Sequence, residues 1–334
     1  MRYAIYGSGA IGSVLAARLI EAGEDVSVIA RGPHLAAIQK NGLQVRSRLF
    51  GDMLVHPPAS DNPTDIGPVD AVLITVKALA APAIAPQVKA LTGPDTFIVT
   101  FQNGVPWWYF HGLGGDWEGQ RVEAVDPSGV ISDNIDVERV IGGIAYCSAH
   151  VAEPGVVVHQ DSNRFPLGEP SGERTERIQS LAQSFLNADL KAALRTEIRH
   201  EIWVKLLGNV PFNPISALTR ATLGEFLGFE PTRDLVRAVM AEVRATAEAY
   251  GVKIGITTEQ RIEGARKVAG HKTSMLQDLE AGRPPELEPI VGAVIELAEK
   301  AEVDVPNIRA IYALTKLLMD PAASTALPPR TAAN

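Results

Sequence analysis

The chain has 334 residues, of which 46% are hydrophobic, and a formal net charge of −8 at pH 7. This length and composition predict two domains, each with a hydrophobic core. The negative charge and the lack of a long basic run argue against nucleic acid or an anionic membrane as a partner. No apolar run approaches the roughly 18 residues of a membrane span, and the first strand follows no signal peptide, so we expect a cytoplasmic protein. The single cysteine, Cys147, excludes an intrachain disulfide framework.

The N-terminal segment carries the first informative motif. An apolar strand at residues 1–6 runs directly into Gly7-Ser8-Gly9-Ala10-Ile11-Gly12, which opens a helical pattern. This is the G-x-G-x-x-G fingerprint in the strand–turn–helix context that dinucleotide binding requires. Gly7 would allow the tight turn, Gly9 the approach of a pyrophosphate, and Gly12 the close packing of helix on strand. We assign all six residues to cofactor binding; the alternative is a glycine-rich turn without a ligand.

The end of the second predicted strand, residues 25–30, indicates which cofactor is used. An NAD enzyme usually offers Asp or Glu to the ribose hydroxyls here. This chain has neither residue from Val26 to Gly51, and the strand is followed by Arg31. A guanidinium suits a 2′-phosphate because its planar fork can bind phosphate oxygens through two hydrogen bonds. The sequence therefore predicts NADP(H), unless Arg31 is only a solvated residue at a strand end.

Two further predicted strands, residues 70–76 and 96–101, flank a helical stretch at residues 80–91 and continue a doubly wound parallel sheet. Ligands bind beyond the carboxyl ends of such strands. We therefore expect Lys77 and the segment Gln102-Asn103-Gly104 to border the cofactor, and we include Lys77 and Asn103 among its binding residues.

The following region, from Trp107 to Gly115, combines four consecutive aromatic residues with glycines. It could be a mobile lid, a local packing core or a dimer contact. Strand-like runs at residues 140–150 and 156–160, joined by Glu153-Pro154-Gly155, predict a hairpin that closes the first domain.

Helical spacing dominates the rest of the chain, with predicted helices at residues 175–187, 199–207, 233–250, 258–268, 287–299 and 307–318. The expected fold is α/β, with an N-terminal Rossmann-type doubly wound parallel sheet and a C-terminal all-α domain. We assign residues 1–172 to an NADP-binding Rossmann domain, residues 173–319 to a helical substrate and catalytic domain, and residues 320–334 to a flexible tail.

The most unusual helical segment runs from Trp203 to Pro214. Lys205 and Asn209 share one helix face through their i, i+4 spacing. Pro211 and Pro214 are expected to interrupt the helix beside Asn213. Lys205 has apolar neighbours, so it is either a partly desolvated proton donor or a lysine that reaches solvent from a core helix.

A second polar cluster includes Ser274 and Glu286. Taken alone, Ser274 is expected to cap the N-terminus of a helix over residues 275–281, and Glu286 to favour the positive end of the next helix dipole. Both therefore have purely structural interpretations.

Together these motifs resemble the ketopantoate reductase (2-dehydropantoate 2-reductase) family, from Met1 to about Leu318. The resemblance rests on the glycine motif, Arg31, Lys77, Asn103-Gly104, Trp203-x-Lys205-x-x-x-Asn209-x-x-x-Asn213-Pro214, Ser274-Met275-Leu276-Gln277-Asp278 and Glu286. It implies NADPH-dependent reduction of 2-dehydropantoate to pantoate, a step toward pantothenate and coenzyme A. It also implies that Lys205 is the general acid, that Glu286 accepts the substrate hydroxyl, that Asn209, Asn213 and Ser274 hold the substrate, and that Asn103 bridges cofactor and substrate.

Alternatives remain for the substrate and the function class. The family often has a Tyr-Asn-Gly-like run where this chain has Pro289-Ile290-Val291-Gly292, so a same-fold reductase of another branched or hydroxylated 2-keto acid is a rival. A non-catalytic NADP(H) sensor is a remote alternative, because a sensor needs no proton donor. The spacing of histidines, with one cysteine, predicts no metal site. A homodimer is possible.

Overall fold

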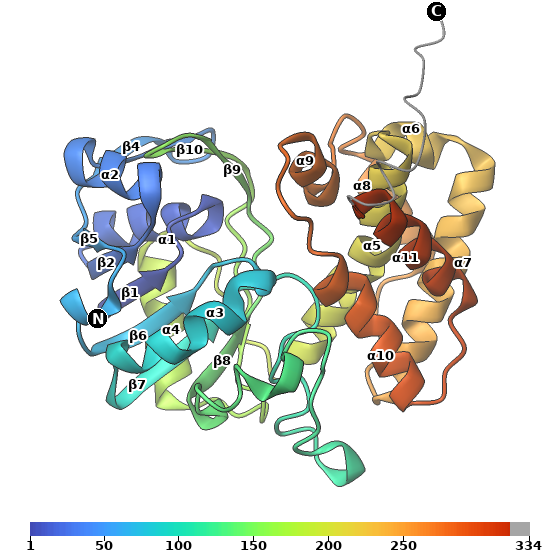
Figure 1. The fold of residues 1–334 in the computed structure, drawn as a ribbon, viewed down its shortest axis with the longest axis horizontal. Coiled ribbons are helices and arrows are strands. Elements are labelled where there is room, and N and C mark those ends of the chain that lie inside the picture. The colour runs from blue at the N-terminus through green and yellow to red at the C-terminus, as the bar shows by residue number, and fades with distance from the viewer. Residues whose placement is uncertain (321–334) are drawn as a thin grey trace, which may run out of the picture. The chain divides into compact units, whose positions relative to one another are not determined.

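The structure is a computed structural model that describes residues 1–320. It contains two compact units, Met1–Glu201 and a second that begins at Ile202. Figure 1 shows a sheet with helices in the first unit and helices alone in the second, which confirms the predicted fold class. The predicted flexible tail, residues 320–334, lies outside the described residues except for Asp320.

Seven strands form the main sheet of the first unit, in the order β11-β8-β7-β6-β1-β2-β5. Neighbours pair in parallel except β8 and β11, which are antiparallel. β1 pairs with β2 on one side and with β6 on the other, so the strand order reverses at β1, and ligands bind beyond the carboxyl ends of strands at such a reversal. The strands are β1 (Arg2–Tyr6), β2 (Asp25–Ile29), β5 (Ala59–Ser60), β6 (Val69–Ile74), β7 (Thr92–Thr100), β8 (Val140–Gly143) and β11 (Leu167–Gly168).

A second sheet of four strands covers the outer side of the first helix. Helix α1 (Ala10–Glu21) contacts β1 and β2 of the main sheet and all four strands of the second sheet. That sheet has the order β4-β3-β10-β9 and consists of β3 (Leu43–Ser47), β4 (Gly51–Val55), β9 (Ser148–Glu153) and β10 (Val156–Asp161). The sequence analysis did not predict β3 and β4. The other helices of this unit are α2 (Gly32–Asn41), α3 (Ala81–Val88) and α4 (Glu176–Asn187).

The predicted hairpin is only partly correct. β9 and β10 do pair as an antiparallel hairpin across residues 154–155. The first predicted run, residues 140–150, is two strands: β8 joins the main sheet beside β7, and β9 belongs to the second sheet. The glycines of β8 explain its place, because Gly142 packs against Trp108 and Gly143 against Phe101, where a larger side chain would not fit.

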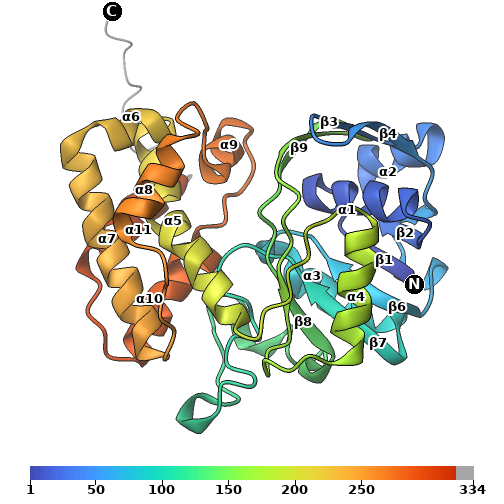
Figure 2. The same cartoon turned by 180° about the vertical axis from the view of Figure 1, so that it is seen from behind.

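The first unit also extends past the boundary predicted at residues 172–173. Helix α4 packs on the main sheet (Figure 2), and the hydroxyl of Tyr3 in β1 donates to Ser184 Oγ at 2.7 Å. The fully buried Phe185 stacks on Phe101 with ring centroids 6.1 Å apart. The amphipathic pattern of residues 175–187 predicts a helix correctly, but it does not reveal which core that helix completes.

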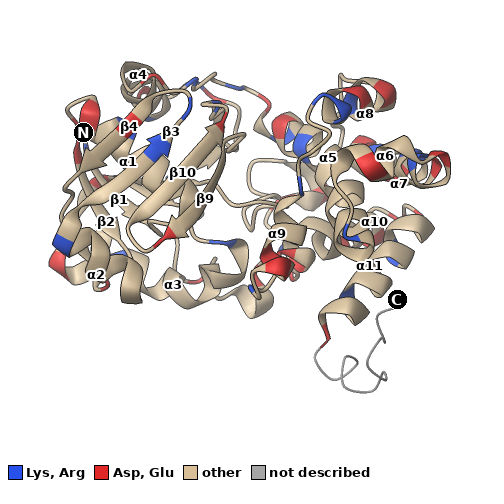
Figure 3. Cartoon of the chain, turned by 90° about the horizontal axis from the view of Figure 1, so that it is seen from above, with Lys and Arg blue, Asp and Glu red and all other residues tan. Residues whose placement is uncertain are grey.

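The second unit consists of helices over its described residues. α5 (Ile198–Thr219) begins at the end of the first unit and continues into the second. Basic and acidic residues are interspersed along α7 (Glu230–Ala249) and α8 (Thr258–Arg266) (Figure 3), as on solvated helix faces. Within residues 1–320 no helix is both long and apolar enough to span a membrane. The remaining helices are α6 (Leu223–Gly228), α9 (Ser274–Glu280), the π-helical turn η7 (Glu288–Gly292), α10 (Ala293–Lys300) and α11 (Pro306–Met319).

Helix α5 corrects the prediction that its prolines interrupt it, because it runs on through both Pro211 and Pro214. A proline inside a helix removes one N–H donor and costs about 3 kcal/mol in an exposed helix. Here nearly every residue from Leu206 to Ala217 is buried. Burial of apolar side chains on all sides of α5 offsets that cost and keeps the helix continuous.

Candidate active site

The glycine-rich loop joins β1 to α1 at the carboxyl end of the main sheet. The backbone N–H groups of Gly7 and Ser8 both donate to the carbonyl oxygen of Ile29 in β2, at 3.1 and 3.0 Å. Gly7 has φ +107°, and a Cβ atom there would lie 2.6 Å from Val76 Cγ1. The turn therefore requires glycine for its backbone conformation and for its close approach to the segment after β6.

The other two glycines of the motif have opposite surroundings. A Cβ atom on Gly12 would overlap the carbonyl oxygen of Gly7 and lie 2.5 Å from Thr75 Oγ1, whereas one on Gly9 would have no atom within 4 Å. Gly9 is also the N-cap of α1, whose first N–H groups lack intrahelical acceptors. Open space beside a helix N-terminus suits a bound pyrophosphate. The loop thus has room for a dinucleotide pyrophosphate, and its role in cofactor binding stays a prediction.

Side-chain hydroxyls hold this loop in shape. Thr75, directly after β6, donates to the Gly7 carbonyl oxygen at 2.7 Å, and Ser13 in α1 donates to the Ser8 carbonyl oxygen at 3.1 Å. Ser8 itself is 2% exposed, with its hydroxyl 3.2 Å from that of Ser13. The loop is therefore fixed from both the adjacent strand and its own helix.

Arg31 follows β2 and is the N-cap residue of α2. Its side chain is exposed. Burial raises the pKa of the Tyr6 hydroxyl at the end of β1, and the positive charge of Arg31 opposes that rise. Arg31 thus acts electrostatically at the carboxyl ends of β1 and β2, where the sequence analysis expected the ribose of the cofactor.

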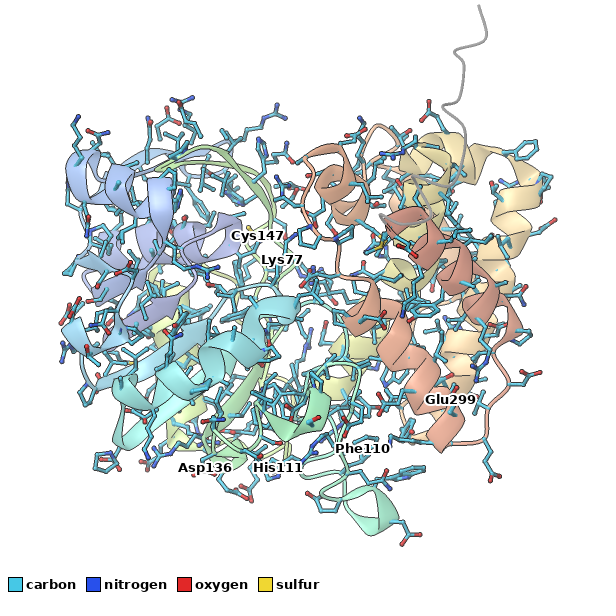
Figure 4. All side chains as sticks on the ribbon, viewed as in Figure 1. Lys77, Phe110, His111, Asp136, Cys147 and Glu299 are labelled. Atoms are coloured by element: carbon cyan, nitrogen blue, oxygen red, sulfur yellow. The ribbon has the colours of Figure 1, made fainter. Side chains whose placement is uncertain are left out.

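Lys77 and Asn103 lie beyond the carboxyl ends of two neighbouring strands, β6 and β7. Lys77 is half-buried at the N-cap of a short 3₁₀ turn, residues 78–80, and Figure 4 labels it there. Asn103 is half-buried and precedes Gly104, which has φ +91° as a tight turn requires. Beside it, the amide Nε2 of Gln102 is buried without a hydrogen-bond partner among the described residues. Both predicted residues therefore belong to the sheet edge that carries the glycine-rich loop.

In the second unit, Lys205, Asn209 and Asn213 follow one another at i, i+4 and i+8 on one face of α5. Lys205 and Asn209 are half-buried, and Asn213 is 4% exposed. The amide Nδ2 of Asn213 has no hydrogen-bond partner among the described residues. Since buried polar groups are normally paired, this donor suits a ligand acceptor.

Ser274 and Glu286 come from two other elements of the second unit. The predicted cap at Ser274 is wrong by one residue: Thr273 caps α9, its hydroxyl accepting from the N–H of Leu276 at 3.4 Å. Ser274 is the exposed first residue of the helix. This shift leaves the Ser274 hydroxyl outside the capping interaction.

Glu286 is 7% exposed and precedes a helix that begins at Leu287 with the π-helical turn η7. The predicted helix over residues 287–299 is thus correct in place, but its first turn is wider than an α-helix. Such turns are frequent at functional sites.

Known proteins match the chain along its length. Residues 3–110 match the family described as Ketopantoate reductase PanE/ApbA, and residues 197–319 match Ketopantoate reductase PanE/ApbA C terminal. The 2-dehydropantoate 2-reductase of Mesorhizobium japonicum is 48% identical over 320 residues, which cover 95% of this chain and 98% of that protein. The chain belongs to the ketopantoate reductase family.

Other members and solved structures agree with this placement. The 2-dehydropantoate 2-reductase of Archaeoglobus fulgidus is 29% identical over 316 residues, covering 94% of this chain and 97% of that one. The crystal structure of 2-dehydropantoate 2-reductase from Geobacter metallireducens has a TM-score of 0.84 and 31% identity, covering 95% of this chain and all of that one (100%). A D-mandelate dehydrogenase structure with NADH and anilino(oxo)acetate, at 20% identity and a TM-score of 0.81, covers 95% and 97% and shows a common fold alone.

Membership of the ketopantoate reductase family confirms the predicted resemblance and makes the chain a pyridine nucleotide-dependent oxidoreductase acting on CH–OH groups. Within residues 1–320 no three His, Cys, Asp or Glu side chains gather as metal ligands.

The aromatic segment after β7 is a packing core of the first unit. Trp107, Trp108, Tyr109 and Phe110 are all at most 6% exposed. Trp108 donates from Nε1 to Thr100 Oγ1 at 2.8 Å. The Arg199 guanidinium donates to the carbonyl oxygens of Tyr109 and Pro170 at 2.9 and 2.8 Å. The sequence analysis left three alternatives for this segment: a mobile lid, a local packing core or a dimer contact. The burial and hydrogen bonds of these side chains favour a local packing core.

One residue near the glycine-rich loop was not singled out in the sequence analysis. His34, in the first turn of α2, accepts a hydrogen bond at Nδ1 from the N–H of Gly155 at 3.0 Å, and the Ser8 backbone nearby opposes the lowering of its pKa by burial. Its position three residues after Arg31 is the only signal in the sequence, and a lone histidine is a weak one.

Proposed function

We propose that this ketopantoate reductase family member reduces 2-dehydropantoate to pantoate with NADPH. The observation that carries the proposal is the polar face of α5, with half-buried Lys205 beside Asn209 and the unpaired amide of Asn213. The 48% identity with a curated 2-dehydropantoate 2-reductase over 95% of the chain supports the same substrate.

The cofactor half of the proposal rests on the first unit. Bound NADPH supplies a hydride to the ketone carbon of the substrate. The open side of Gly9 and the N-terminus of α1 suit its pyrophosphate, Arg31 its 2′-phosphate, and Lys77 and Asn103 border the same sheet edge. Arg31 favours NADPH over NADH because a guanidinium binds a phosphate dianion far better than a neutral hydroxyl.

Lys205 is proposed as the general acid. When hydride reaches a ketone carbon, the oxygen becomes an alkoxide, and an adjacent ammonium both stabilises that charge and supplies the proton. The half-buried setting of Lys205 among the buried side chains of Trp203, Leu206 and Leu207 strengthens this electrostatic effect, because water screens it less.

The remaining residues hold the substrate. Asn209, Asn213 and Ser274 are donors suited to a carboxylate or carbonyl oxygen. Buried Glu286 would repel an anionic keto acid unless a substrate hydroxyl donates a hydrogen bond to its carboxylate. This requirement favours a hydroxylated keto acid over a plain one, and 2-dehydropantoate carries such a hydroxyl.

A matched pair of substrates tests the proposal. Initial rates of NADPH oxidation are compared for 2-dehydropantoate and for 3,3-dimethyl-2-oxobutanoate, which lacks only the hydroxyl, with benzoylformate as an aromatic keto acid. We expect kcat/KM for 2-dehydropantoate to exceed that of the deoxy analogue at least about 100-fold, because the analogue lacks the hydroxyl that is proposed to donate to the Glu286 carboxylate.

Two other results would overturn the proposal. Faster reduction of another branched or aromatic keto acid would make the chain a same-fold reductase with a different substrate. Tight NADPH binding with no turnover of any keto acid would make it a sensor.

A further inference from the structure

We infer that Arg261 binds the carboxylate of the substrate, through a guanidinium that lies on α5 within one helical turn of Lys205. This inference rests on the proposed reduction of a 2-keto acid, and it names the residue that neutralises the acid group. The sequence analysis did not single out Arg261, which belongs to α8.

Gly208 allows this guanidinium to lie directly on α5. A Cβ atom at position 208 would overlap Nη2 of Arg261 and lie 2.5 Å from its Cζ atom, so a larger residue would displace the arginine. Glycine is also unfavourable inside a helix, because it loses more backbone entropy on folding than any other residue. A glycine in the interior of α5 therefore has a packing reason, and that reason is the guanidinium of Arg261.

The guanidinium covers the side of α5 that carries the proposed general acid. Gly208 follows Lys205 at i+3, and Phe212 follows Gly208 at i+4, so these positions are neighbours on one helix face. Cζ of Arg261 lies over the Phe212 ring, 5.3 Å from its centroid, where a cation is attracted to the ring face. Lys205 and Asn209 on this side of α5 are half-buried, whereas Gly208 beneath the arginine is buried.

The first turn of α8 holds Arg261 in place. Thr257 caps the helix: its hydroxyl accepts from the N–H of Gln260 at 3.1 Å, and its own N–H donates to Gln260 Oε1 at 2.8 Å. Ile262, the residue after Arg261, is 2% exposed. A side chain that extends from a capped and buried turn loses little freedom when it binds a ligand.

The charges around Arg261 suit an anionic ligand. The acidic residues of its own helix, Glu259 and Glu263, bind other arginines: Arg237 at 2.8 Å and Arg266 at 3.6 Å. A guanidinium carries several N–H donors in one plane, so it can bind both oxygens of a carboxylate while its other donors hold protein groups.

A 2-keto acid requires such a cation close to Lys205. Its carboxylate is bonded directly to the ketone carbon, so the group that binds the carboxylate must lie near the group that protonates the ketone oxygen. Arg261, which lies on Gly208 one turn after Lys205, meets this requirement. With the carboxylate on Arg261, the ammonium of Lys205 stays available to the oxygen on which negative charge develops.

Steady-state kinetics of the full chain with a matched pair of substrates tests the inference. 2-Dehydropantoate is compared with 4-hydroxy-3,3-dimethyl-2-oxobutanamide, in which a neutral amide replaces the carboxylate and nothing else changes. For Arg261→Gln we expect kcat/KM for the acid to fall about 100-fold, mainly through KM, and kcat/KM for the amide to change less than about threefold. Arg266→Gln, which alters an exposed arginine of the same helix, is the control and should leave both values within about twofold.

Gly208→Ala is a second variant that removes no charge. Its methyl group would displace the guanidinium of Arg261 from α5, so KM for the acid should rise at least about tenfold, while KM for the amide stays within about threefold. This variant provides the same comparison if Arg261→Gln does not fold.

The outcomes separate this inference from the proposed function. A native protein that does not turn over 2-dehydropantoate would overturn both. Native turnover with equal kcat/KM for acid and amide, or a preference for the acid that Arg261→Gln leaves unchanged, would overturn the role of Arg261 alone. Equal losses for acid and amide in Arg261→Gln would make Arg261 a structural link between α8 and α5, which also overturns the inference.

Discussion

Lys205 lies half-buried on the face of α5 that also carries Asn209 and Asn213. We expect Lys205→Ala to lower kcat by roughly 10²- to 10⁴-fold, because the alkoxide then lacks its proton donor. Binding of NADP⁺ should be unchanged, since the glycine-rich loop belongs to the first unit. Steady-state kinetics and calorimetry measure the two effects.

The matched control for Lys205 is Lys267, an exposed lysine at the C-cap of α8 in the same unit. Lys267→Ala should leave kcat within about twofold of the native value, as surface substitutions generally do. A Lys205→Ala enzyme with native turnover would remove Lys205 from its proposed role.

At the scale of single residues, the sequence predicted which residues share a helix face better than it predicted the burial and hydrogen bonding of their side chains. The spacing of Lys205 and Asn209 indicated a shared helix face, and the structure places them so. The buried amide of Asn213, which has no hydrogen-bond partner within residues 1–320, could not be predicted, because its surroundings are side chains that meet only in the folded unit. Thr273, not Ser274, caps α9, and the sequence did not distinguish them because both residue types are suited to an N-cap.

The loop between β1 and α1 gives a paired prediction from its glycines. Gly9 has φ −82°, and a Cβ atom there would meet nothing within 4 Å, so Gly9→Ala should leave the stability of the ligand-free protein unchanged or slightly higher. It should weaken NADP⁺ binding at least about tenfold, because the added methyl group occupies the space that suits the pyrophosphate.

Gly12→Ala is the contrasting variant. Its methyl group would overlap the Gly7 carbonyl oxygen and crowd Thr75, so we expect the free energy of unfolding to fall by about 1–3 kcal/mol even without ligand. Urea denaturation and calorimetry distinguish the two variants. Native affinity for NADP⁺ in Gly9→Ala would show that the open side of the loop is not the pyrophosphate site.

Helix α11 depends on a buried carboxylate from another helix. Its N-cap residue, Val305, cannot accept a hydrogen bond through its side chain. Glu242 in α7, 9% exposed, accepts instead from the N–H groups of Asn307 and Ile308 at 3.0 and 2.8 Å. Glu242→Ala leaves the buried N–H of Ile308 and the half-buried N–H of Asn307 without this acceptor, so the free energy of unfolding should fall by about 3 kcal/mol in urea denaturation.

A surface carboxylate provides the comparison for Glu242. Glu263 pairs with Arg266 at 3.6 Å, and its side chain is 63% exposed. Glu263→Ala should change stability by less than about 0.5 kcal/mol. Equal losses from the two variants would contradict the capping role of Glu242.

At the scale of elements, periodicity predicted most helices and the parallel strands, and it failed where tertiary packing overrides local preference. Two prolines predicted a break in α5, yet burial of the surrounding side chains keeps the helix continuous. β3 and β4 have five residues each, and the alternation of buried and exposed positions in β3 is too short to stand out in the sequence. Register with β10 and contact with α1 define these strands.

For the whole molecule, two half-buried histidines predict how stability depends on pH. Burial lowers the pKa of His34 and of His271 below the ordinary value of 6.5. As pH falls through 6.5, the unfolded chain binds protons that the folded chain resists, so the free energy of unfolding decreases; above that range these groups add no pH dependence. Calorimetric Tm should therefore fall between pH 7.5 and 5.5.

A variant isolates the contribution of His271. His271→Gln removes one of the two groups, so the fall in Tm over this interval should be smaller, while carboxylates titrate mainly at lower pH. A Tm that rises on acidification, or an identical pH profile in the variant, would contradict the prediction.

The sequence predicted the structural class of the two domains, but it did not predict where the first unit ends. Alternating strands and helices, followed by helices alone, indicated an α/β domain and a helical domain. The first unit nevertheless reaches Glu201 because α4 buries Phe185 against the main sheet. A helical pattern in sequence carries no information about which of two cores will bury its apolar face.

The central claim is NADPH-dependent reduction of 2-dehydropantoate, and one measurement tests it directly. Purified protein is supplied with 2-dehydropantoate and either NADPH or NADH, and cofactor oxidation and pantoate formation are followed together. We expect one pantoate per NADPH oxidised, with kcat/KM at least about tenfold higher for NADPH than for NADH. Oxidation of neither cofactor, or equal use of both, would contradict the account.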